Sequence, residues 1–537
     1  MASSRVFLGI CLLSSLAFVG TNLHGKGSSR ITNRSIVPSL QEIDYERAGR
    51  EAIRQFNIAD VRYALTYLAS DSLEGRETAE PGQKKAAEFI AARFQNLGLI
   101  PVGDSGTYLQ HFSVAVHYIS DSSFVETDRK YFRANRDIVV MPFGAGDTTI
   151  TAPCVFAGYG FESDTYSDYK GIDAKGKIVI LLAGNPPFAD TSNVMIRTEL
   201  YKRSNAMKHG AAAVLLAVRG GNAEFAKIHQ RFNSMFGNKS MTIDTGTKAT
   251  NSATLMQMIY INEIVANAFL KKREMNMDNV RQKIDSSRSP ASLTLGDATV
   301  RVKTVSEIRQ TENVVGMLEG SSLKNEYVVY SAHYDHLGKT ADGVIYHGAD
   351  DNASGTSTVL GIAEMYSKSK IKPKRSIIFL TVTGEEKGLL GSDYFTTHPV
   401  VPITDIVTDL NTDMDGRIDT SYINRGGSYV FVIGSRRLST ELDSLLISAD
   451  SQSVKIKLDY AFDSDNDPNR FYYRSDHYNF AKKNIPVVFF FDGNHPDYHK
   501  PTDTSDKIDF NILEKRAKLI FMTGWEAANL DWRLRLN

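Results

Sequence analysis

The sequence predicts an α/β fold whose mostly parallel, mixed central sheet has helices on both faces and is interrupted by a smaller inserted α/β domain. The first observation is an alternation that begins near Asn313. There the apolar runs NVVGMLEG, YVVYSAH and SIIFLTVTG are separated by loops and by the helix-like segment SGTSTVLGIAEMYSKS. Such alternation is typical of a parallel sheet covered by helices. The second observation is a change of composition near Tyr131, after which short β-like runs and turns continue to about Val300.

The chain begins with a segment typical of a secretory signal peptide, residues 1–20. Arg5 precedes the apolar stretch VFLGICLLSSLAFVG, and the small residues Ser15 and Ala17 offer a cleavage site. The apolar stretch is shorter than the about 20 residues that a spanning helix needs, so export is favoured over the alternative of an uncleaved anchor. Residues 21–42 are polar and are expected to form a flexible leader.

The elements that follow are predicted from periodicity and from turn residues. The segment PGQKKAAEFIAARFQNLGL predicts an amphipathic helix from Pro81 to about Leu97, with Gly98 at its end. In the insertion, IVVMPFG, APCVFAGYGF, KGKIVILLAG and AAAVLLAV predict strands, with a helix near Arg197–His209. The tract from about 220 to 250 is polar and Met-rich and is expected to be an extended loop. The chain closes on a predicted helix, ILEKRAKLIFMTGWEAANL.

Composition narrows the function classes. Lys plus Arg and Asp plus Glu both number 62, so no net charge would draw the protein to nucleic acid or to an anionic membrane. After signal removal no apolar run of membrane-spanning length remains. The cysteines are Cys11 and Cys154, so the mature chain would have no internal disulfide. Cys154 lies in the apolar setting TAPCVFAG and is expected to be a buried small side chain.

Six residues of the second half predict a two-metal site, because most of them follow strand-like runs. In an open parallel sheet, ligands gather outside the carboxyl ends of the strands. Histidine and carboxylate ligands suit zinc, with cobalt or manganese as substitutes. The six are His333, Asp350, Glu385, Glu386, Asp413 and His499.

The roles within this set are predicted from chemistry. A carboxylate next to a metal ligand can take a proton from a metal-activated water, so we assign Glu385 as general base and Glu386 as ligand. The spacing alone does not fix that order. Asp335 is expected to orient His333, because a metal-bound histidine usually passes its other ring proton to a carboxylate. Asp351 is the rival of Asp350, and His495 is the rival of His499.

These motifs, in this order, resemble the co-catalytic zinc exopeptidases of metallopeptidase clan MH, in its twenty-eighth family. The resemblance covers DSLEGRETAEPGQKKAAEFIAARFQNLGL and then ENVVGMLEG to about Asp509. It implies that Asp350 bridges two zinc ions, that His333 and Asp413 complete one, and that Glu386 and His499 complete the other. Glu385 would be the catalytic base, with Asp335 orienting His333.

The resemblance extends to the insertion and to one loop. The signature FAGYGF followed by DYKGIDAKGKIVIL is similar to the start of a protease-associated domain. The implied organisation is a zinc peptidase domain formed by residues 43–130 and 301–537, with the protease-associated domain at 131–300. The loop FYYRSDHYNFAKKNIP resembles the family's Ser-Asp-His segment, so Asp476 and His477 either line the substrate site or brace the following strand.

The expected function is therefore a secreted or periplasmic dizinc aminopeptidase acting on peptide or protein N-termini. A carboxypeptidase of the same family is the first alternative, and it would need a cation such as Arg425, Arg470 or Arg474 to hold the substrate carboxylate. A non-catalytic, receptor-like binding module is the second. A missing ligand would have favoured that module, and none of the predicted ligands is missing.

Overall fold

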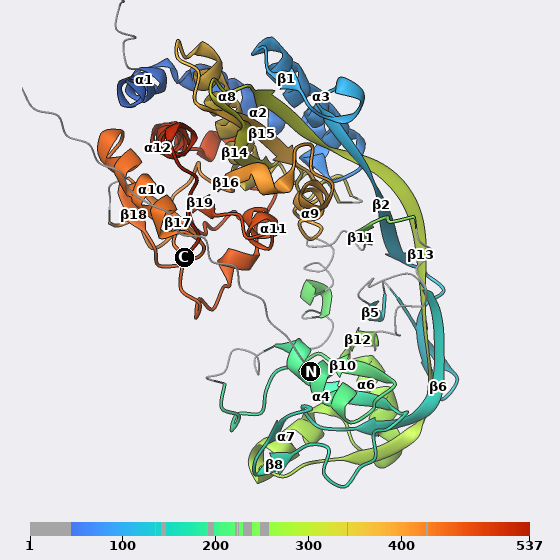
Figure 1. Ribbon diagram of the computed structural model, residues 1–537. Helices are drawn as coiled ribbons and strands as arrows, with labels where there is room; N and C mark the ends of the chain where they lie inside the picture. The colour runs from blue at the N-terminus through green and yellow to red at the C-terminus, as the bar shows by residue number, and fades with distance from the viewer. Residues whose placement is uncertain are drawn as a thin grey trace, which may run out of the picture. The chain divides into compact units, whose positions relative to one another are not determined.

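The structure is a computed structural model that describes residues 44–537 apart from 135, 141–145, 192–197, 221–222, 224, 229–238, 247–256, 341 and 426–427 (Figure 1). The predicted signal peptide and leader lie outside the described residues. Among the residues that are described, no helix combines the length and the apolar character needed to cross a bilayer.

The central sheet of the main domain is mixed, with a parallel middle. Strand β14 pairs in parallel with β15 and β16, and β16 pairs in parallel with β19. Antiparallel neighbours flank this middle, since β13 pairs with β15 and β17 with β19, while β18 runs parallel to β17. The α/β fold class predicted from the sequence is confirmed. The bounds are β13 Leu293–Leu318, β14 Leu323–His333, β15 Arg375–Val382, β16 Ile406–Thr412, β17 Tyr429–Ile433, β18 Lys457–Asp459 and β19 Val487–Phe491.

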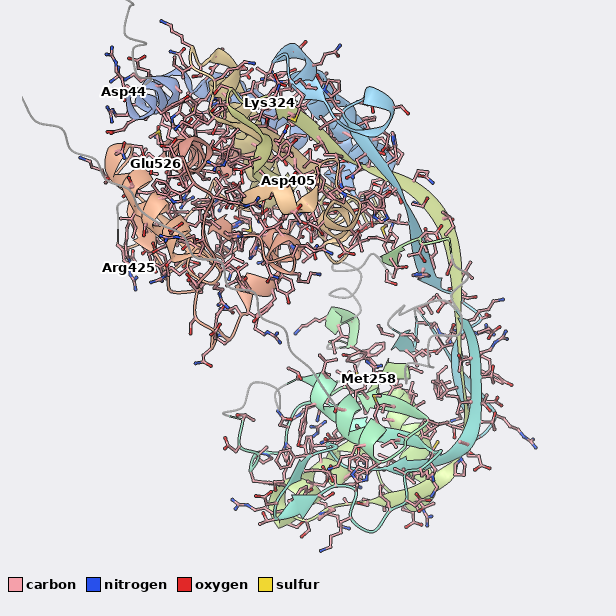
Figure 2. The ribbon with its side chains drawn as sticks, in the orientation of Figure 1. Asp44, Met258, Lys324, Asp405, Arg425 and Glu526 are labelled. Atoms are coloured by element: carbon pink, nitrogen blue, oxygen red, sulfur yellow. The ribbon has the colours of Figure 1, made fainter. Side chains whose placement is uncertain are left out.

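Helices cover both faces of this sheet because successive strand residues point to opposite sides. Val328 and Tyr330 of β14 belong to one hydrophobic cluster, and Val329 between them belongs to another. The side chains that fill these clusters are drawn in Figure 2. Helices on the first face include α2 Ile58–Leu68, α3 Pro81–Asn96, α8 Gly355–Lys368, α10 Thr440–Gln452 and α12 Phe510–Asn529. Helices on the second face are α9 Leu390–Thr397 and α11 His477–Ala481.

The inserted region builds a second, smaller α/β unit. Strands β6, β9, β10 and β12 pair in parallel in that order, and β5 adds to β12 antiparallel. Its hydrophobic clusters are separate from those of the main domain and include Cys154. Burial raises the pKa of the Cys154 thiol to about 12, so this cysteine stays protonated. The bounds are β5 Ile138–Val140, β6 Gly146–Phe156, β9 Ile178–Leu182, β10 Ala213–Ala217, β12 Gln257–Ile261, α4 Glu199–Lys208, α6 Glu263–Leu270 and α7 Met277–Ser287.

Strand β13 runs through both regions without interruption. Its first half pairs with β6 and with β3 (Phe124–Thr127), and its second half pairs with β2 (Leu109–Ile119) and β15. Near Val300, where the insertion was predicted to end, β13 continues without a break. Part of the tract expected to be loop also forms a strand, since β11 (Lys239–Ile243) pairs antiparallel with β2.

Candidate metal centre

The predicted site residues lie together at the carboxyl ends of the parallel strands. His333 is the last residue of β14, Glu386 follows β15, and Asp413 follows β16. Asp351 lies in the turn Ala349–Ser354 that leads into α8, and His499 lies in the loop after β19. These residues lie at or just after the ends of their strands, as expected for a ligand site on an open parallel sheet.

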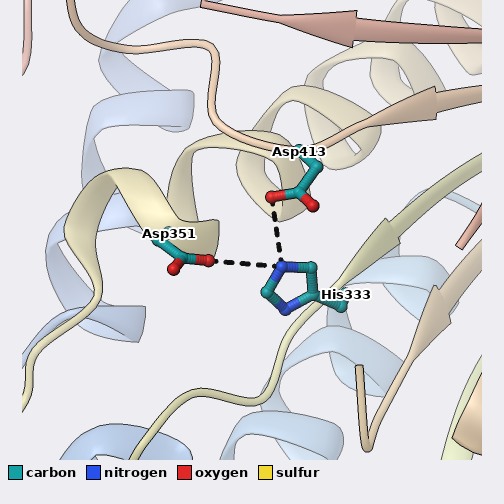
Figure 3. A group of neighbouring side chains, drawn as sticks. All are labelled: His333, Asp351 and Asp413. Carbon is teal, nitrogen blue, oxygen red and sulfur yellow. Dashed lines mark hydrogen bonds and ion pairs between the residues drawn. The ribbon is translucent and has the colours of Figure 1, made fainter. Parts of the chain in front are cut away.

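One group of donor atoms surrounds His333. Its Nε2 atom lies 3.2 Å from Asp413 Oδ1 and 3.3 Å from Asp351 Oδ1 (Figure 3). Donors of a tetrahedral zinc ion with bonds of about 2.0 Å lie about 3.3 Å apart. The three side chains are buried and could therefore share one cation.

A second group of donor atoms surrounds the other carboxylate oxygen of Asp351, Oδ2. His499 Nε2 is 3.1 Å from Asp351 Oδ2 and 3.2 Å from Glu386 Oε2. His336, which the sequence analysis did not select, places Nδ1 2.8 Å from Glu386 Oε1. Asp351, His336 and Glu386 form a second set of donors close enough to hold an ion.

Asp351, rather than Asp350, faces both donor groups, which differs from the placement of Asp350 predicted from the sequence. Asp350 Oδ1 accepts the backbone N–H of Gly416 at 2.8 Å, and Oδ2 lies 3.1 Å from His495 Nε2. Asp350 and His495 thus contact each other, and neither belongs to the two donor groups. Consecutive side chains of this turn point in different directions. A turn has no regular repeat of side-chain directions, so the sequence does not show which of the two aspartates faces the donor groups.

The electrostatics of the site favour bound cations. Burial alone would lower the pKa of His333 and of His499. Neighbouring carboxylates instead raise both pKa values well above the ordinary value, Asp413 and Glu385 for His333 and Glu386 and Asp351 for His499. Carboxylates gathered in a buried place are stable only when paired with positive charge. Imidazole and carboxylate donors suit zinc, cobalt or manganese, so the residues present fit the predicted metals.

Glu385 lies beside the first group but is not one of its donors. Its Oε2 atom is 4.0 Å from His333 Nε2, and its backbone N–H donates to Asp335 Oδ1 at 3.3 Å. Burial raises the pKa of Glu385 well above its ordinary value, and nearby Asp413 and Glu386 raise it further. This carboxylate therefore lies beside the first donor group without being one of its donors.

Asp335 stands behind His333. Its backbone oxygen is 3.2 Å from His333 Nδ1, its Oδ1 atom is 3.7 Å from the same nitrogen, and Thr78 Oγ1 donates to its Oδ2 at 2.7 Å. Next to Thr78, Glu77 forms ion pairs with Lys387 at 3.1 Å and with Lys239 of β11 at 3.0 Å. A residue of the tract that was expected to be loop, Lys239, therefore pairs with the chain neighbour of Thr78.

Arg76 is a second supporting residue that the sequence analysis missed. It is fully buried, and burial lowers its pKa to about 10. Its guanidinium donates to the backbone oxygens of Tyr334 at 2.8 Å, His347 at 2.8 Å and Gly348 at 2.9 Å. It thereby ties the segment after β14 to the turn that carries Asp351. The sequence held no signal for it beyond its place in DSLEGRE.

A pocket opens beside the first donor group. Asp351, Glu385 and Asp413 form its polar side, and the rest is mainly aromatic or apolar. The other lining residues are Met414, Phe471, Arg474, Phe489, Phe491, Asn494 and Tyr498.

Asp476 and His477 are fully buried and are not among the residues that line this pocket. The His477 ring stacks on Phe489 of β19 with 4.9 Å between ring centroids, and burial lowers its pKa to about 3. Of the two roles proposed for this pair, bracing of the strand is the one that the contacts of His477 favour.

Relatives share the architecture over most of the chain. Aminopeptidase YwaD of Bacillus subtilis (strain 168) is 22% identical over 525 residues, covering 94% of this chain and 92% of that protein. An aminopeptidase from Aneurinibacillus sp. strain AM-1 has a TM-score of 0.57 at 20% identity, covering 91% of this chain and 98% of its own. BSAP, a zinc aminopeptidase from Bacillus subtilis, has a TM-score of 0.53 at 18% identity, covering 89% and 96%. The chain therefore has the fold of these structures.

The strand ends that carry the donor groups lie within the part of the chain that matches a protein-family model. The family model of Peptidase family M28 matches residues 313–523. That range begins at the end of β13 and contains both donor groups, the supporting Asp335 and Glu385. Residues 313–523 are therefore a Peptidase family M28 domain.

Proposed function

We propose that the chain is an exported aminopeptidase that uses two zinc ions to remove amino acids from the N-termini of peptides. One observation carries this proposal: Asp351 faces His333 with one oxygen, at 3.3 Å, and His499 with the other, at 3.1 Å. A single carboxylate can thus offer one oxygen to each of two cations and fix their separation. Solved relatives described as aminopeptidases support the direction of cleavage.

The residue roles follow from this placement. His333 and Asp413 would hold one ion, Glu386 and His499 the other, and Asp351 both. When bound, the ions would polarise the scissile carbonyl and activate a water. Glu385, whose Oε2 atom lies 4.0 Å from His333 Nε2, would accept the proton of that water and pass it to the leaving amine.

The pocket supports an apolar residue at the cleaved position. Phe471, Phe489 and Phe491 line it together with Met414 and with carboxylates of the donor groups. Aromatic and sulfur-containing side chains bind apolar groups by excluding water and by dispersion. We infer that peptides beginning with an apolar residue are cleaved faster than peptides beginning with a charged one.

Carboxypeptidase activity is the second candidate, and one residue favours it. Of the three arginines considered, Arg474 lines the pocket, whereas Arg425 and Arg470 lie over the rings of Tyr422 and Tyr473. The guanidinium of Arg474 is 3.4 Å from the Tyr498 hydroxyl. A cation at this place could hold the terminal carboxylate of a substrate.

Three versions of one apolar peptide separate the candidates: free at both ends, N-acetylated, and C-amidated. The zinc-loaded protein should shorten the free and amidated peptides stepwise and leave the acetylated one intact, as followed by mass spectrometry. Cleavage of the acetylated but not the amidated peptide would establish the carboxypeptidase instead. Chelated protein should be inactive. Glu385→Gln should lose about 1,000-fold in kcat, the usual scale for a general base, while retaining both metals.

Two further parts of the proposal concern the rest of the chain. The inserted region is proposed to be a protease-associated domain, supported by its separate hydrophobic clusters. Residues 1–20 are proposed to direct export and to be removed. The mass of the protein recovered from outside the expressing cell tests this, because an intact N-terminus there would contradict cleavage.

A further inference from the structure

His336 lies in the second donor group without belonging to the predicted ligand set. It is fully buried, three residues beyond His333. Its ring packs against Gly348, where an added Cβ atom would come within 2.5 Å of the ring. Its backbone N–H donates to Arg76 O at 3.2 Å, so the segment that carries the ring is held in place.

Three polar atoms converge at this point. His336 Nδ1 lies 2.8 Å from Glu386 Oε1 and 3.8 Å from Asp351 Oδ2. Each of these three atoms is buried and has no hydrogen-bond partner of acceptable geometry among the described residues. Buried polar atoms are nearly always hydrogen-bonded, so three neighbouring exceptions need an explanation. A cation between them would satisfy all three at once.

The imidazole of His499 approaches the same two carboxylates, those of Asp351 and Glu386. Its Nε2 atom lies near Asp351 Oδ2 and Glu386 Oε2, whereas His336 lies near Glu386 Oε1. The two rings are 6.0 Å apart between centroids and inclined by 70°. Both nitrogens are thus directed at one pair of carboxylates, which is the arrangement of ligands around a shared ion and not of a hydrogen-bonded chain.

We propose that His336 is a direct ligand of the second ion, together with His499, Glu386 and Asp351. This inference rests on the proposed two-metal site. The first centre then has one imidazole, from His333, with Asp413 and Asp351, and keeps open positions. The second has two imidazoles, and zinc accepts such expanded coordination. Nitrogen ligands favour zinc and cobalt over manganese, so the second centre binds zinc more tightly than the first and discriminates more strongly against manganese.

Cobalt binding to His336→Cys tests the contact directly. A thiolate bound to cobalt(II) gives a charge-transfer absorption that imidazole does not give. Apo protein of this variant, titrated with two equivalents of cobalt(II), should develop that absorption in the near ultraviolet. Cys154 is buried in the inserted region and gives the background in the unaltered protein.

His347→Cys is the matched control. His347 lies in the same region of the chain, but its ring nitrogens face Asp71 Oδ1 at 2.8 Å and Pro501 O at 3.3 Å. Its cysteine variant should bind cobalt without the charge-transfer absorption. Cobalt bound to His336→Cys with no such absorption, or with an absorption equal to that of the control, would overturn the proposal.

His336→Asn separates ligation from hydrogen bonding. Asparagine can keep a donor near Glu386 but is a poor ligand, so resistance of the tighter zinc to a competing chelator should fall by at least about 100-fold. Retention of both zinc ions at wild-type affinity would contradict ligation. If neither variant folds, proton NMR of the cobalt-loaded wild type decides, since three bound imidazoles give three shifted exchangeable N–H signals and two give two. None of these readouts depends on peptide cleavage, so failure of the proposed activity would be seen separately.

Discussion

Two buried polar clusters of this chain differ in whether their charged side chains have hydrogen-bond partners. In the insertion, Asp168 lies under the FAGYGF turn and accepts the backbone N–H groups of Tyr159 and Phe161, both at 3.0 Å, and the Tyr166 hydroxyl at 2.6 Å. Lys202 donates to Tyr159 O at 2.6 Å. In the metal cluster, formed by the two donor groups, buried atoms of His336, Asp351 and Glu386 have no well-aligned hydrogen-bond partner among the described residues.

The difference indicates which charges serve the fold and which serve a ligand. A buried carboxylate whose oxygens are occupied by local backbone N–H groups stabilises its own turn. A Cβ atom on Gly158 would come within 2.2 Å of Asp168 Oδ1, so the turn is built closely around this carboxylate. Buried nitrogen and carboxylate oxygen atoms that converge without hydrogen-bond partners lower the stability of the fold unless a ligand binds them. Asp168 of the first cluster is hydrogen-bonded as folded, whereas the second cluster has the unpaired buried atoms that the proposed cations would satisfy.

Among the tests of this comparison between the two clusters, the largest effect is expected from the loss of the residue that both donor groups share. Asp351→Asn removes the charge that faces His333 and His499, so we expect fewer than two zinc ions per chain and a fall in activity of at least about 100-fold. Elemental analysis after dialysis measures the metal content. Asp350→Asn is the matched control, since it keeps an acceptor for Gly416 N–H and should retain both ions. The reverse pattern would restore the sequence assignment of Asp350.

A smaller effect is expected from the support behind His333. Asp335→Asn should weaken zinc binding by about 10–100-fold, measured by chelator competition, because it weakens the partner that fixes the imidazole. Thr78→Val removes the hydroxyl that donates to Asp335 at 2.7 Å and should act in the same direction. Thr78→Ser keeps that hydroxyl and should behave like the wild type. Unchanged metal affinity in Asp335→Asn would show that His333 needs no such support.

In the insertion, the expected effect is on stability alone. Asp168→Ala leaves the N–H groups of Tyr159 and Phe161 buried without an acceptor, which should cost about 2–3 kcal/mol of the free energy of unfolding. Thermal unfolding measures the loss, and the zinc content of the folded protein should stay at the wild-type value. Asp164→Ala, at an exposed position of the same segment, should change neither. Loss of zinc in Asp168→Ala would show that the two clusters are coupled.

The smallest effect concerns a half-buried carboxylate that accepts hydrogen bonds from two neutral side chains. Glu526 of α12 (Figure 2) accepts from Gln452 Nε2 at 3.0 Å and Ser448 Oγ at 3.3 Å, and burial raises its pKa to about 7. In the unfolded chain a glutamate ionises near pH 4.3. As pH rises from about 4 to 7, the unfolded state therefore releases this proton first and the fold loses stability.

Glu526→Gln should remove that loss. Because the carboxylate is partly solvated, the gain should be only about 1 kcal/mol at pH 8, and close to zero at pH 4, by denaturant unfolding. Glu514→Gln, on the same helix and paired with Lys518, is the control. A gain of equal size at both pH values would mean that packing and not ionisation is responsible.

Much of the main domain and most of the site could be predicted from the sequence. The helix at Pro81–Asn96 and the strands that end at His333 and Val382 follow from apolar periodicity and from turn residues. The choice between Asp350 and Asp351 could not be predicted, because alternation of side chains holds within a strand and not within a turn. His336 was missed for the same reason, since β14 ends at His333.

The sequence also failed where a strand is exposed on both faces. Between Lys303 and Gln310 most side chains of β13 are exposed or half-buried, so polar and apolar residues do not alternate as in a strand with one buried face. Only pairing with β2, whose residues lie about 190 positions earlier in the chain, reveals the strand. Such long-range pairing leaves no mark on local composition.

The continuity of β13 also constrains how the chain can change in length. Its residues Ala298, Val300 and Val302 point into the core of the insertion, and Val314 points into that of the main domain. Since successive strand residues point to opposite faces, adding or deleting one residue between these anchors would turn one half of the strand over relative to the other. Two residues would preserve the parity. Insertions and deletions between Val302 and Val314 should therefore be tolerated, if at all, only in even numbers.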